Sequence, residues 1–253
     1  MAVRGSMMTE LVEWIDGRDR LGDIRMFCFP HAGAGGRVFR PWIGTLGPDI
    51  AVCPVLLPAR EQRWREPAAT TMAEVVDPLY RTILAWDERP YALFGHSLGA
   101  GIAHALAVRL HQTPGAPQPK HLFVSGRPAP WLRARMPSST TMSDEEFTVR
   151  LKSLDGTPAE ILTDPGMLAA LLPVLRADFA VSESYRAVDA PRLSIPVTVF
   201  GGQADPLAEP DELLAWREAT GGPFALKIFP GGHFFLTESP EPILDAVRSA
   251  LSR

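Results

Sequence analysis

The sequence predicts an α/β fold in which helices cover both faces of a mostly parallel sheet. Short apolar runs alternate along the chain with segments whose apolar residues recur at helical spacing. Most of the apolar runs are continuous rather than alternating, as expected of strands buried on both faces. The chain has 253 residues, of which 46% are hydrophobic and 21% charged. Because this length and composition suit one large α/β domain, we expect a single domain over residues 1–253.

The apolar runs predict six strands, in chain order: Ile24 to Pro30, Ile50 to Pro58, Tyr91 to Phe94, His121 to Ser125, Ile195 to Gly201 and Ala225 to Pro230. Four helices are expected between and after them: Thr71 to Trp86, Ala100 to Leu110, Glu209 to Thr220 and Pro240 to Ser252. Pro78 should kink the first of these helices or mark its true start. The proline-rich stretch 114–119 should close the second helix rather than link two domains.

Residues 127–188 break this alternation, because they contain helix-like stretches and no strand candidate. The stretches are SDEEFTVRLKSL, PAEILTD and PGMLAALLPVLRADFAVSESYR. A helical insertion between two strands of a sheet is typical of a lid over a binding site. The alternative is a larger helical layer of the core.

Residues 94–100, FGHSLGA, place a serine between two glycines where an apolar run meets a helical one. A strand-turn-helix with G-x-S-x-G indicates a nucleophile elbow, in which the serine holds a strained backbone conformation. Side chains larger than hydrogen at Gly95 or Gly99 would clash in so tight a turn. The pattern also arises by chance as a glycine-rich connection, so Ser97 needs support from the rest of the chain.

A serine nucleophile needs a base, and the base needs an acid that orients it. His233 is the expected base, because it follows an apolar run in a glycine-rich turn that exposes its ring above the sheet. Asp205 follows the apolar run before it, in the turn GGQADP, and is the expected acid. Three other acids rank lower, since they lie in the insertion or begin a helix: Asp164, Asp178 and Glu209. The order Ser97, Asp205, His233 is that of the α/β-hydrolase fold, which the sequence therefore predicts.

Two backbone N–H groups are expected to bind the oxyanion that forms when Ser97 attacks a carbonyl. Leu98 follows the nucleophile at a helix start, where the helix dipole favours negative charge. Ala32 lies in the small-residue loop 29–36, FPHAGAGG, which lets the backbone approach a substrate. The same loop fails as a dinucleotide site, because Val38 stands where G-x-G-x-x-G requires its third glycine, and a Walker lysine is absent.

Composition and spacing argue against several other classes of protein. The net charge of -4 disfavours general nucleic-acid binding, which needs a basic face. Histidines and cysteines occur without zinc-site spacing, so we expect no metal. Cys28 and Cys53 should be reduced core residues, the alternative being a disulfide between neighbouring strands. No apolar run of membrane-span length or signal-peptide core is apparent, so we expect a cytoplasmic protein without membrane contact. Residues 1–7 could be an added leader and are set aside.

Six segments together resemble the type II thioesterases, the discrete editing thioesterases of polyketide and nonribosomal peptide assembly lines. They are FCFPHAGAGG at 27–36, FRPW at 39–42, LPARE at 57–61, LFGHSLGAGIA at 93–103, LLPVLRADFAVSESY at 171–185 and FPGGHFFL at 229–236. The resemblance runs from about residue 10 to the C-terminus and includes segments of the insertion. Ala59 stands where this family usually has glycine, and Leu98 where methionine is common. Leu98 would act through its backbone, so the expected chemistry is unchanged.

The resemblance implies hydrolysis of acyl thioesters on the phosphopantetheine arm of acyl or peptidyl carrier proteins, which clears stalled or aberrant acyl groups without a cofactor. His233 would take the proton of Ser97, Asp205 would orient the imidazole, and water would then release the acid from the acyl-enzyme. Two alternatives remain open. One is a small-ester or lipase-type carboxylesterase with the same triad. The other is a non-catalytic module that only binds acylated carrier proteins.

Contacts to the acyl chain and the carrier protein are expected on the insertion and on two arginine clusters. Apolar side chains such as Met167, Leu168 and Leu172 would line an acyl pocket, unless they only pack the insertion onto the sheet. Carrier proteins are typically acidic and phosphopantetheine carries a phosphate, both of which arginine binds in a bidentate manner. The clusters are Arg60, Arg63 and Arg65, and Arg127, Arg133 and Arg135; either could instead be ordinary solvated surface. The protein is expected to be a monomer.

Overall fold

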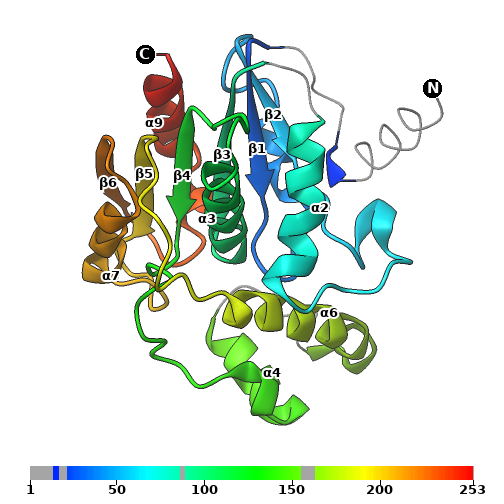
Figure 1. Ribbon diagram of the computed structural model, residues 1–253. Coiled ribbons are helices and arrows are strands. Elements are labelled where there is room, and N and C mark those ends of the chain that lie inside the picture. The colour runs from blue at the N-terminus through cyan, green and yellow to red at the C-terminus, as the bar shows by residue number, and fades with distance from the viewer. Residues whose placement is uncertain (1–13, 17–21, 86–88, 155–162, 253) are drawn as a thin grey trace, which may run out of the picture.

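A computed structural model of the protein describes residues 14–16, 22–85, 89–154 and 163–252 (Figure 1). In this part of the chain the strands form one sheet of six, in the order β2-β1-β3-β4-β5-β6, and neighbouring strands are parallel. The strands are β1 (Ile24–Phe29), β2 (Ile50–Pro54), β3 (Tyr91–His96), β4 (His121–Ser125), β5 (Val197–Gly202) and β6 (Phe224–Phe229). All six expected strands are thus present, with ends that differ by a few residues.

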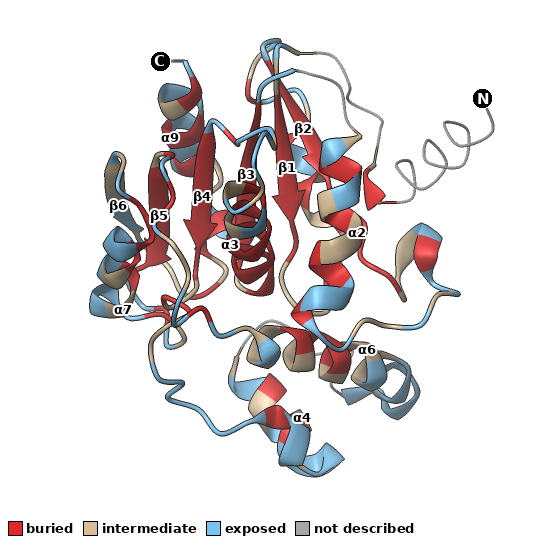
Figure 2. Ribbon diagram, viewed as in Figure 1, coloured by how far each residue is buried: buried red, intermediate tan, exposed pale blue. Residues whose placement is uncertain are grey.

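Helices cover both faces of this sheet, as the continuous apolar runs predict. One face packs against α2 (Met72–Leu84), α3 (Leu98–His111) and the 3-10 helix η4 (Ala215–Ala219). The other packs against the 3-10 helix η1 (Gly36–Trp42), the short helix α8 (Phe235–Glu238) and α9 (Glu241–Leu251). Alternate strand residues divide between the two clusters, and β1 to β5 are drawn almost entirely as buried in Figure 2, whereas the edge strand β6 is half-buried to exposed. The sheet is therefore a rigid platform for whatever lies at its edges.

Two expected helices differ from their prediction for local reasons. Helix α2 begins at Met72, because Thr71 and Glu74 form a capping box, and Pro78 lies inside the helix rather than at its start. The stretch expected as one helix from Glu209 to Thr220 is α7 (Pro210–Leu214) followed by η4. Glu209 is the N-cap residue of α7, in agreement with its low rank as a catalytic acid.

The insertion 127–188 contains no strand among its described residues and holds the 3-10 helix η3 (Ser139–Thr141), α4 (Asp144–Ser153) and α6 (Pro165–Ser184). The expected helix PAEILTD falls mostly outside the described residues. Helices α4 and α6 lie beyond the carboxyl ends of the strands, across the end of the sheet (Figure 1). They share a small apolar cluster built on Phe147, Leu151 and Leu175, separate from the two clusters on the sheet. The insertion thus has the position that a lid would need.

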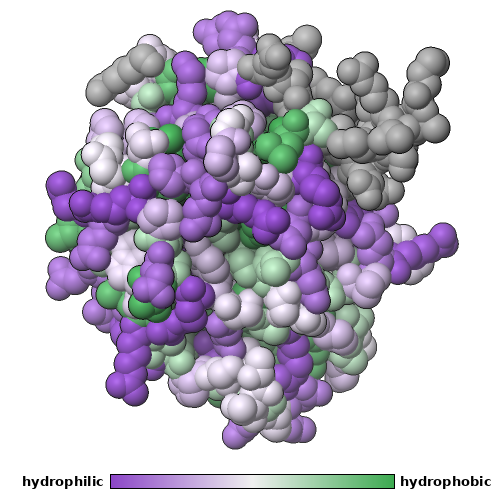
Figure 3. All heavy atoms as spheres, in the orientation of Figure 1, coloured by the Kyte–Doolittle hydropathy of each residue, from purple (hydrophilic) through white to green (hydrophobic). Residues whose placement is uncertain are grey.

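Helix α6 has 20 residues and is long and apolar enough to cross a membrane by length and composition alone. The sequence analysis predicted no apolar segment of this length, so the length and hydropathy of α6 differ from that prediction. A single such helix is weak evidence for a span, because core helices of water-soluble proteins pass the same test. Val181 near the C-terminal end of α6 is buried in the main core. Hydrophobic and hydrophilic residues are intermixed over the lower part of the face seen in Figure 3, where α4 and α6 lie.

The strand order places a crevice at the carboxyl end of the sheet. From β1 the chain moves outward to β2 and then returns to β3 on the other side of β1. The connections after β1 and β3 therefore leave in opposite directions, and such a switch point is where open α/β sheets bind ligands. The loop that begins at Pro30 and the turn at Ser97 are these two connections.

Cys28 and Cys53 lie on the neighbouring strands β1 and β2 and are both free and buried. Burial raises the pKa of the Cys28 thiol well above its ordinary value, with a smaller contribution from Cys53. The prediction of two reduced core cysteines is confirmed, and the disulfide alternative is wrong. A thiol held protonated in this way is a poor nucleophile.

Candidate active site

Ser97 occupies the turn between β3 and α3 in a left-handed conformation, with φ 54° and ψ −114°. A side chain at Gly95 would place its Cβ 2.1 Å from the carbonyl oxygen of Gly99. A Cβ at Gly99 would lie 2.0 Å from the carbonyl oxygen of Phe29. Because real Cβ atoms do not approach that closely, both glycines are required by the turn. The strained serine and the two clashes are the features that the G-x-S-x-G pattern predicts.

Asp205 and His233 meet at the same end of the sheet, in the turns after β5 and β6. The Nδ1 atom of His233 lies 2.8 Å from Oδ2 of Asp205, and both side chains are buried. The other carboxylate oxygen of Asp205 accepts a hydrogen bond from the N–H of Leu207 at 2.8 Å. With Nδ1 held by the carboxylate, the Nε2 atom of a neutral His233 is left as the acceptor. His233 and Ser97 line one small cavity of about 50 Å³.

Three other buried or half-buried histidines, His31, His96 and His121, have partners of their own. His31 Nδ1 donates to the carbonyl oxygen of Ala32 at 3.0 Å, and burial lowers the pKa of His31 to about 4. His96 packs against the His233 ring with centroids 4.8 Å apart, and burial lowers its pKa well below the ordinary value. His121 is bound to Thr198, and burial lowers its pKa to about 4. In the part of the chain that the structure describes, His233 is the histidine paired with a carboxylate.

The two proposed oxyanion donors lie on either side of the nucleophile. Leu98 is the first residue of α3, where a helix N–H has no acceptor within the helix. Ala32 belongs to the loop after β1 and lines both cavities next to Ser97, together with Ser97 itself. The backbone N–H of Ala32 has no acceptor among the described residues. Both groups are therefore available to a ligand.

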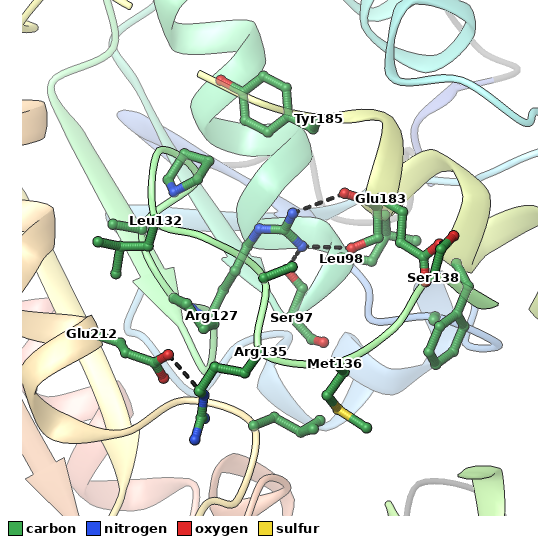
Figure 4. Close-up of a pocket in the computed structure, with 18 of the residues that line it drawn as sticks. Ser97, Leu98, Arg127, Leu132, Arg135, Met136, Ser138, Glu183, Tyr185 and Glu212 are labelled. Atoms are coloured by element: carbon green, nitrogen blue, oxygen red, sulfur yellow. Dashed lines mark hydrogen bonds and ion pairs between the residues drawn. The ribbon is translucent and has the colours of Figure 1, made fainter. Parts of the chain in front are cut away.

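A larger cavity of about 430 Å³ also opens at Ser97, between the β4–η3 segment and α6 (Figure 4), and shares Ala32, Ser97 and Phe179 with the small cavity. Its charged lining residues are Arg127, Arg133, Arg135, Arg150, Arg186, Glu183 and Glu212. Five arginines against two glutamates give this cavity an excess of positive charge. Leu132, Met136 and Phe179 supply apolar surface. The cavity therefore suits a long ligand that is partly apolar and carries negative charge.

Arg127 crosses this cavity beside Ser97 and binds the C-terminal end of α6 (Figure 4). Its Nη1 donates to Ser182 Oγ at 2.7 Å, and its Nη2 donates to the carbonyl oxygen of Ser182 at 3.1 Å. Burial lowers the pKa of Arg127 to about 10, still above physiological pH. The hydrogen bonds to Ser182 make Arg127 a structural link between the sheet and α6 as well as a cavity residue.

The second arginine cluster of the sequence analysis is only partly available to a partner. Arg135 is paired with Glu209 and Glu212 at 2.5 Å and 2.8 Å. Arg133 is exposed and has no ion pair among the described residues. Of the three predicted residues, Arg133 is thus the one that is both exposed and without an ion pair in the described part of the chain.

Two arginines of the first cluster point inward and are taken up by other contacts, so the structure does not favour this cluster as a docking face. Arg60 is bound to Asp178 with both side chains buried. Arg63 is also buried and is bound to Glu66 and to the carbonyl oxygen of Leu56. Only Arg65 remains, over the exposed ring of Trp64. Sequence proximity alone could not reveal that two of these guanidinium groups point inward.

The predicted acyl-pocket residues are placed differently by the structure. Met167 is 57% exposed, and Leu172 packs into the α4–α6 cluster. Met167, Leu168 and Leu172 are absent from the linings of both cavities next to Ser97. The apolar residues of the insertion that line the small cavity are Leu151, Leu154, Leu175 and Phe179. Leu175 and Phe179 lie on α6 with the predicted residues but on the face turned toward Ser97, whereas Leu151 and Leu154 come from α4 and its C-cap.

The two lower-ranked acids of the insertion have structural partners. Asp164 caps α6 by accepting a hydrogen bond from the N–H of Met167 at 2.8 Å. Asp178 is paired with Arg60 and also accepts a hydrogen bond from Gly33. Among the described residues, no group of three or more His, Cys, Asp or Glu side chains could hold a metal ion. Glu61 and Tyr185 were not predicted at the site, and Arg60 was predicted only as a contact for the carrier protein, since only the folded chain brings these residues near Ser97.

Comparison with known proteins agrees with this geometry. Residues 24–251 match the family model described as the thioesterase domain. The chain belongs to this family. It is 39% identical over 222 residues to the gramicidin S biosynthesis protein GrsT of Aneurinibacillus migulanus, covering 88% of this chain and 86% of that protein. The protein is therefore a thioesterase, a hydrolase that acts on thioesters.

Solved structures of other thioesterases have the same fold. The type II thioesterase BorB of the borrelidin cluster superimposes with a TM-score of 0.83 at 35% identity, covering 94% of this chain and 97% of that one. The RedJ thioesterase of the prodiginine pathway in Streptomyces coelicolor gives 0.81 at 37% identity, covering 90% and 86%. The resemblance to the type II thioesterases and the predicted α/β-hydrolase fold are both confirmed.

Proposed function

We propose that this thioesterase hydrolyses acyl groups from the phosphopantetheine arm of acyl or peptidyl carrier proteins, through a Ser-His-Asp mechanism with an acyl-enzyme intermediate. The observation that carries the proposal is the buried Asp205–His233 pair. His233 and the elbow serine Ser97 line the same small cavity. A binding module would not need a strained serine, a histidine and an acid at that point.

In the first half-reaction, His233 Nε2 takes the proton of Ser97 as Oγ attacks the thioester carbonyl. The oxygen that becomes negative is bound by the N–H groups of Ala32 and Leu98. The C–S bond breaks, and the thiol of phosphopantetheine leaves with the proton from His233. Water, activated by the same imidazole, then attacks the acyl-enzyme and releases the acid. Asp205 holds the imidazole in the required tautomer and stabilises its charged form.

The two cavities that meet at Ser97 would divide the substrate between them. The larger one, with its excess of arginine, would take the phosphopantetheine arm, whose phosphate is anionic and whose chain is long. The small one, lined by Leu151, Leu175 and Phe179, would take the acyl group. Because its volume is about 50 Å³, short acyl groups are the expected substrates while α4 and α6 are in this position. Residues 127–188 would act as the lid over Ser97, and its movement would admit longer groups.

The relatives do not choose between the two kinds of assembly line. GrsT is described as a gramicidin S biosynthesis protein, and BorB comes from the borrelidin cluster. We place this enzyme beside a polyketide or nonribosomal peptide synthase, where it would remove stalled or aberrant acyl groups as a monomer in the cytoplasm. The carrier protein would dock near the mouth of the larger cavity, at Arg133.

Three measurements on the purified protein test the proposal. Ser97→Ala should lower turnover of an acyl-carrier thioester by about a millionfold, because the triad acts as one unit. A serine-directed fluorophosphonate should label the unmodified protein and not this variant. A carrier thioester should be cleaved faster than the oxyester with the same acyl group. Near-normal turnover by Ser97→Ala would overturn the mechanism, and a preference for the oxyester would favour the carboxylesterase alternative.

A further inference from the structure

Three charged side chains surround the loop that carries the proposed oxyanion donor Ala32. Asp178 Oδ2 accepts a hydrogen bond from the N–H of Gly33 at 2.7 Å. Arg60 Nη1 donates to the carbonyl oxygen of Ala34 at 3.0 Å. The carboxylate of Glu61 accepts from the N–H groups of Gly36 and Arg37, both at 3.0 Å. Side chains therefore hold four backbone groups of the loop within five consecutive residues.

Two of these side chains, Arg60 and Asp178, come from distant parts of the chain. Arg60 lies in the turn before the 3-10 helix η2 (Glu61–Arg63), and Asp178 lies on α6 in the insertion. Their side chains pair in a bidentate manner, with Nη1–Oδ2 at 2.7 Å and Nη2–Oδ1 at 2.6 Å. The side chains are only 10% and 5% exposed. A buried pair of this geometry is well shielded from solvent, so its loss leaves an uncompensated buried charge.

The turn that presents Arg60 is strained. Ala59 has φ 64° and Glu61 has φ 49°, so two residues with side chains hold left-handed conformations on either side of Arg60. Strain of this kind persists only where the surroundings determine the conformation. Here the result is that Arg60 points inward toward Asp178 while Glu61 points at the loop.

The glycines of the loop are packed against the same residues. A Cβ at Gly33 would lie 2.6 Å from Cδ2 of Leu175 on α6. A Cβ at Gly35 would lie 2.3 Å from the carboxyl carbon of Glu61. The glycines thus let the loop contact α6 and Glu61 closely, and the hydrogen bonds then fix its backbone. Three segments of the sequence resemblance, at 27–36, 57–61 and 171–185, meet at this point.

We propose that Arg60 and Asp178 are positioning residues that hold the Ala32 N–H toward the oxyanion only while α6 is docked. The inference rests on the proposed function, because it assigns a role to the Ala32 amide. When α6 moves away, Asp178 leaves the Gly33 N–H and Arg60 together, and the loop loses the contacts on both sides of residues 33 and 34. Attack by Ser97 is then slow until the insertion has closed over an acyl group. The closing of the lid and the formation of the oxyanion site are one event.

The test compares turnover with the affinity for a ketone that mimics the transition state. Ser97 Oγ adds to the carbonyl carbon of an acyl trifluoromethyl ketone, its proton passes to His233, and the ketone oxygen becomes an oxyanion. Asp178→Asn should lower kcat for the matching acyl thioester by about 10- to 100-fold, less than the loss of about 100- to 1,000-fold found when one oxyanion donor is removed outright. The KM should change by less than about threefold, and the ketone affinity should fall by the same factor as kcat/KM.

A double variant separates positioning from stability. Arg60→Met with Asp178→Leu replaces the buried ion pair by apolar side chains, an exchange that often preserves or raises stability. It cannot restore the hydrogen bonds to Gly33 and Ala34. We expect this variant to unfold at or above the temperature of the unmodified protein and to remain as slow as Asp178→Asn. Asp144→Asn is the matched control, because it breaks the Arg176–Asp144 pair that joins α4 to α6 without touching the loop. It should leave kcat and the ketone affinity unchanged.

The outcomes distinguish this inference from the proposed function. If the folded double variant regains full kcat, the Arg60–Asp178 pair only stabilises the fold and the inference is wrong. An unchanged ketone affinity in both variants, with kcat reduced, would also overturn it. If instead the unmodified protein is inactive on thioesters, or Ser97→Ala keeps its activity, the failure lies in the proposed function.

Discussion

His104 should make the fold sensitive to acid, because its imidazole is buried in the neutral state. It lies on α3 and is fully buried against the rings of Trp131, Tyr185 and Trp216. Its Nδ1 is 2.8 Å from the hydroxyl of Tyr185, and its Nε2 has no hydrogen-bond partner. Burial first, and the charge of Arg127 second, lower the pKa of His104 to about 3.

The sign and size of the effect follow from the two protonation states. In the unfolded chain an imidazole titrates near pH 6.5, so between pH 6.5 and 3 the unfolded state binds a proton that the folded state does not. The stability that comes from neutral His104 is therefore present above pH 6.5 and is lost as the pH falls. These two pKa values give a loss of about 2 kcal/mol between pH 7 and pH 5, and about 4 kcal/mol by pH 3.

Urea unfolding followed by tryptophan fluorescence measures this loss at pH 7 and pH 5. The variant His104→Asn keeps a polar group near the Nδ1 position and cannot titrate. Its free energy of unfolding should fall by about 2 kcal/mol less over this pH range than that of the unmodified protein. His111→Asn, at the last residue of the same helix, leaves His104 in place and should retain the full loss. Equal losses in the unmodified protein and His104→Asn would refute the reasoning.

Three further predictions concern the site and its surroundings. Asp205→Asn should lower kcat by about a thousandfold or more, because His233 then takes the wrong tautomer, and this loss should exceed that of Asp178→Asn. A larger loss in Asp178→Asn in single-turnover assays would show that Asp205 is not the acid of the triad. Arg133→Glu should raise the KM for an acyl-carrier protein and lose that effect at high salt, while a small acyl thioester is unaffected; equal changes on both substrates would point to damage in the insertion. Ala59→Gly should raise the free energy of unfolding by about 0.5–1 kcal/mol in urea, because the left-handed conformation no longer strains a side chain; a lower value would contradict this.

Much of the site could be predicted because each of its residues lies in a short segment with a recognisable local pattern. The elbow depends on Gly95, Ser97 and Gly99, whose clashes arise within one turn and its neighbouring strand. Asp205 and His233 each follow a strand, and parallel strands bring their carboxyl ends to one edge of the sheet. Chain order and strand ends were therefore enough to propose their pairing, which the 2.8 Å contact bears out.

The contacts between the insertion and the sheet could not be predicted from the sequence. Helical spacing indicates that α6 has an apolar face but not which of its residues meet Ser97, so Met167, Leu168 and Leu172 were proposed where Leu175 and Phe179 line the cavity. The packing of α6 against α3 fixes which of its residues face Ser97, and no short sequence pattern encodes that packing.

The sequence by itself determined the chain order of Ser97, Asp205 and His233, the nucleophile elbow and the family. Tertiary structure alone decided what the charged residues do. Arg60 and Asp178 are separated by 118 residues, and each looks like a surface charge until the turn at Ala59 and the docking of α6 bury them together. Because the energy of an ion pair depends on distance and on exclusion of water, neither of which a sequence contains, such a pair can be recognised only in the folded molecule.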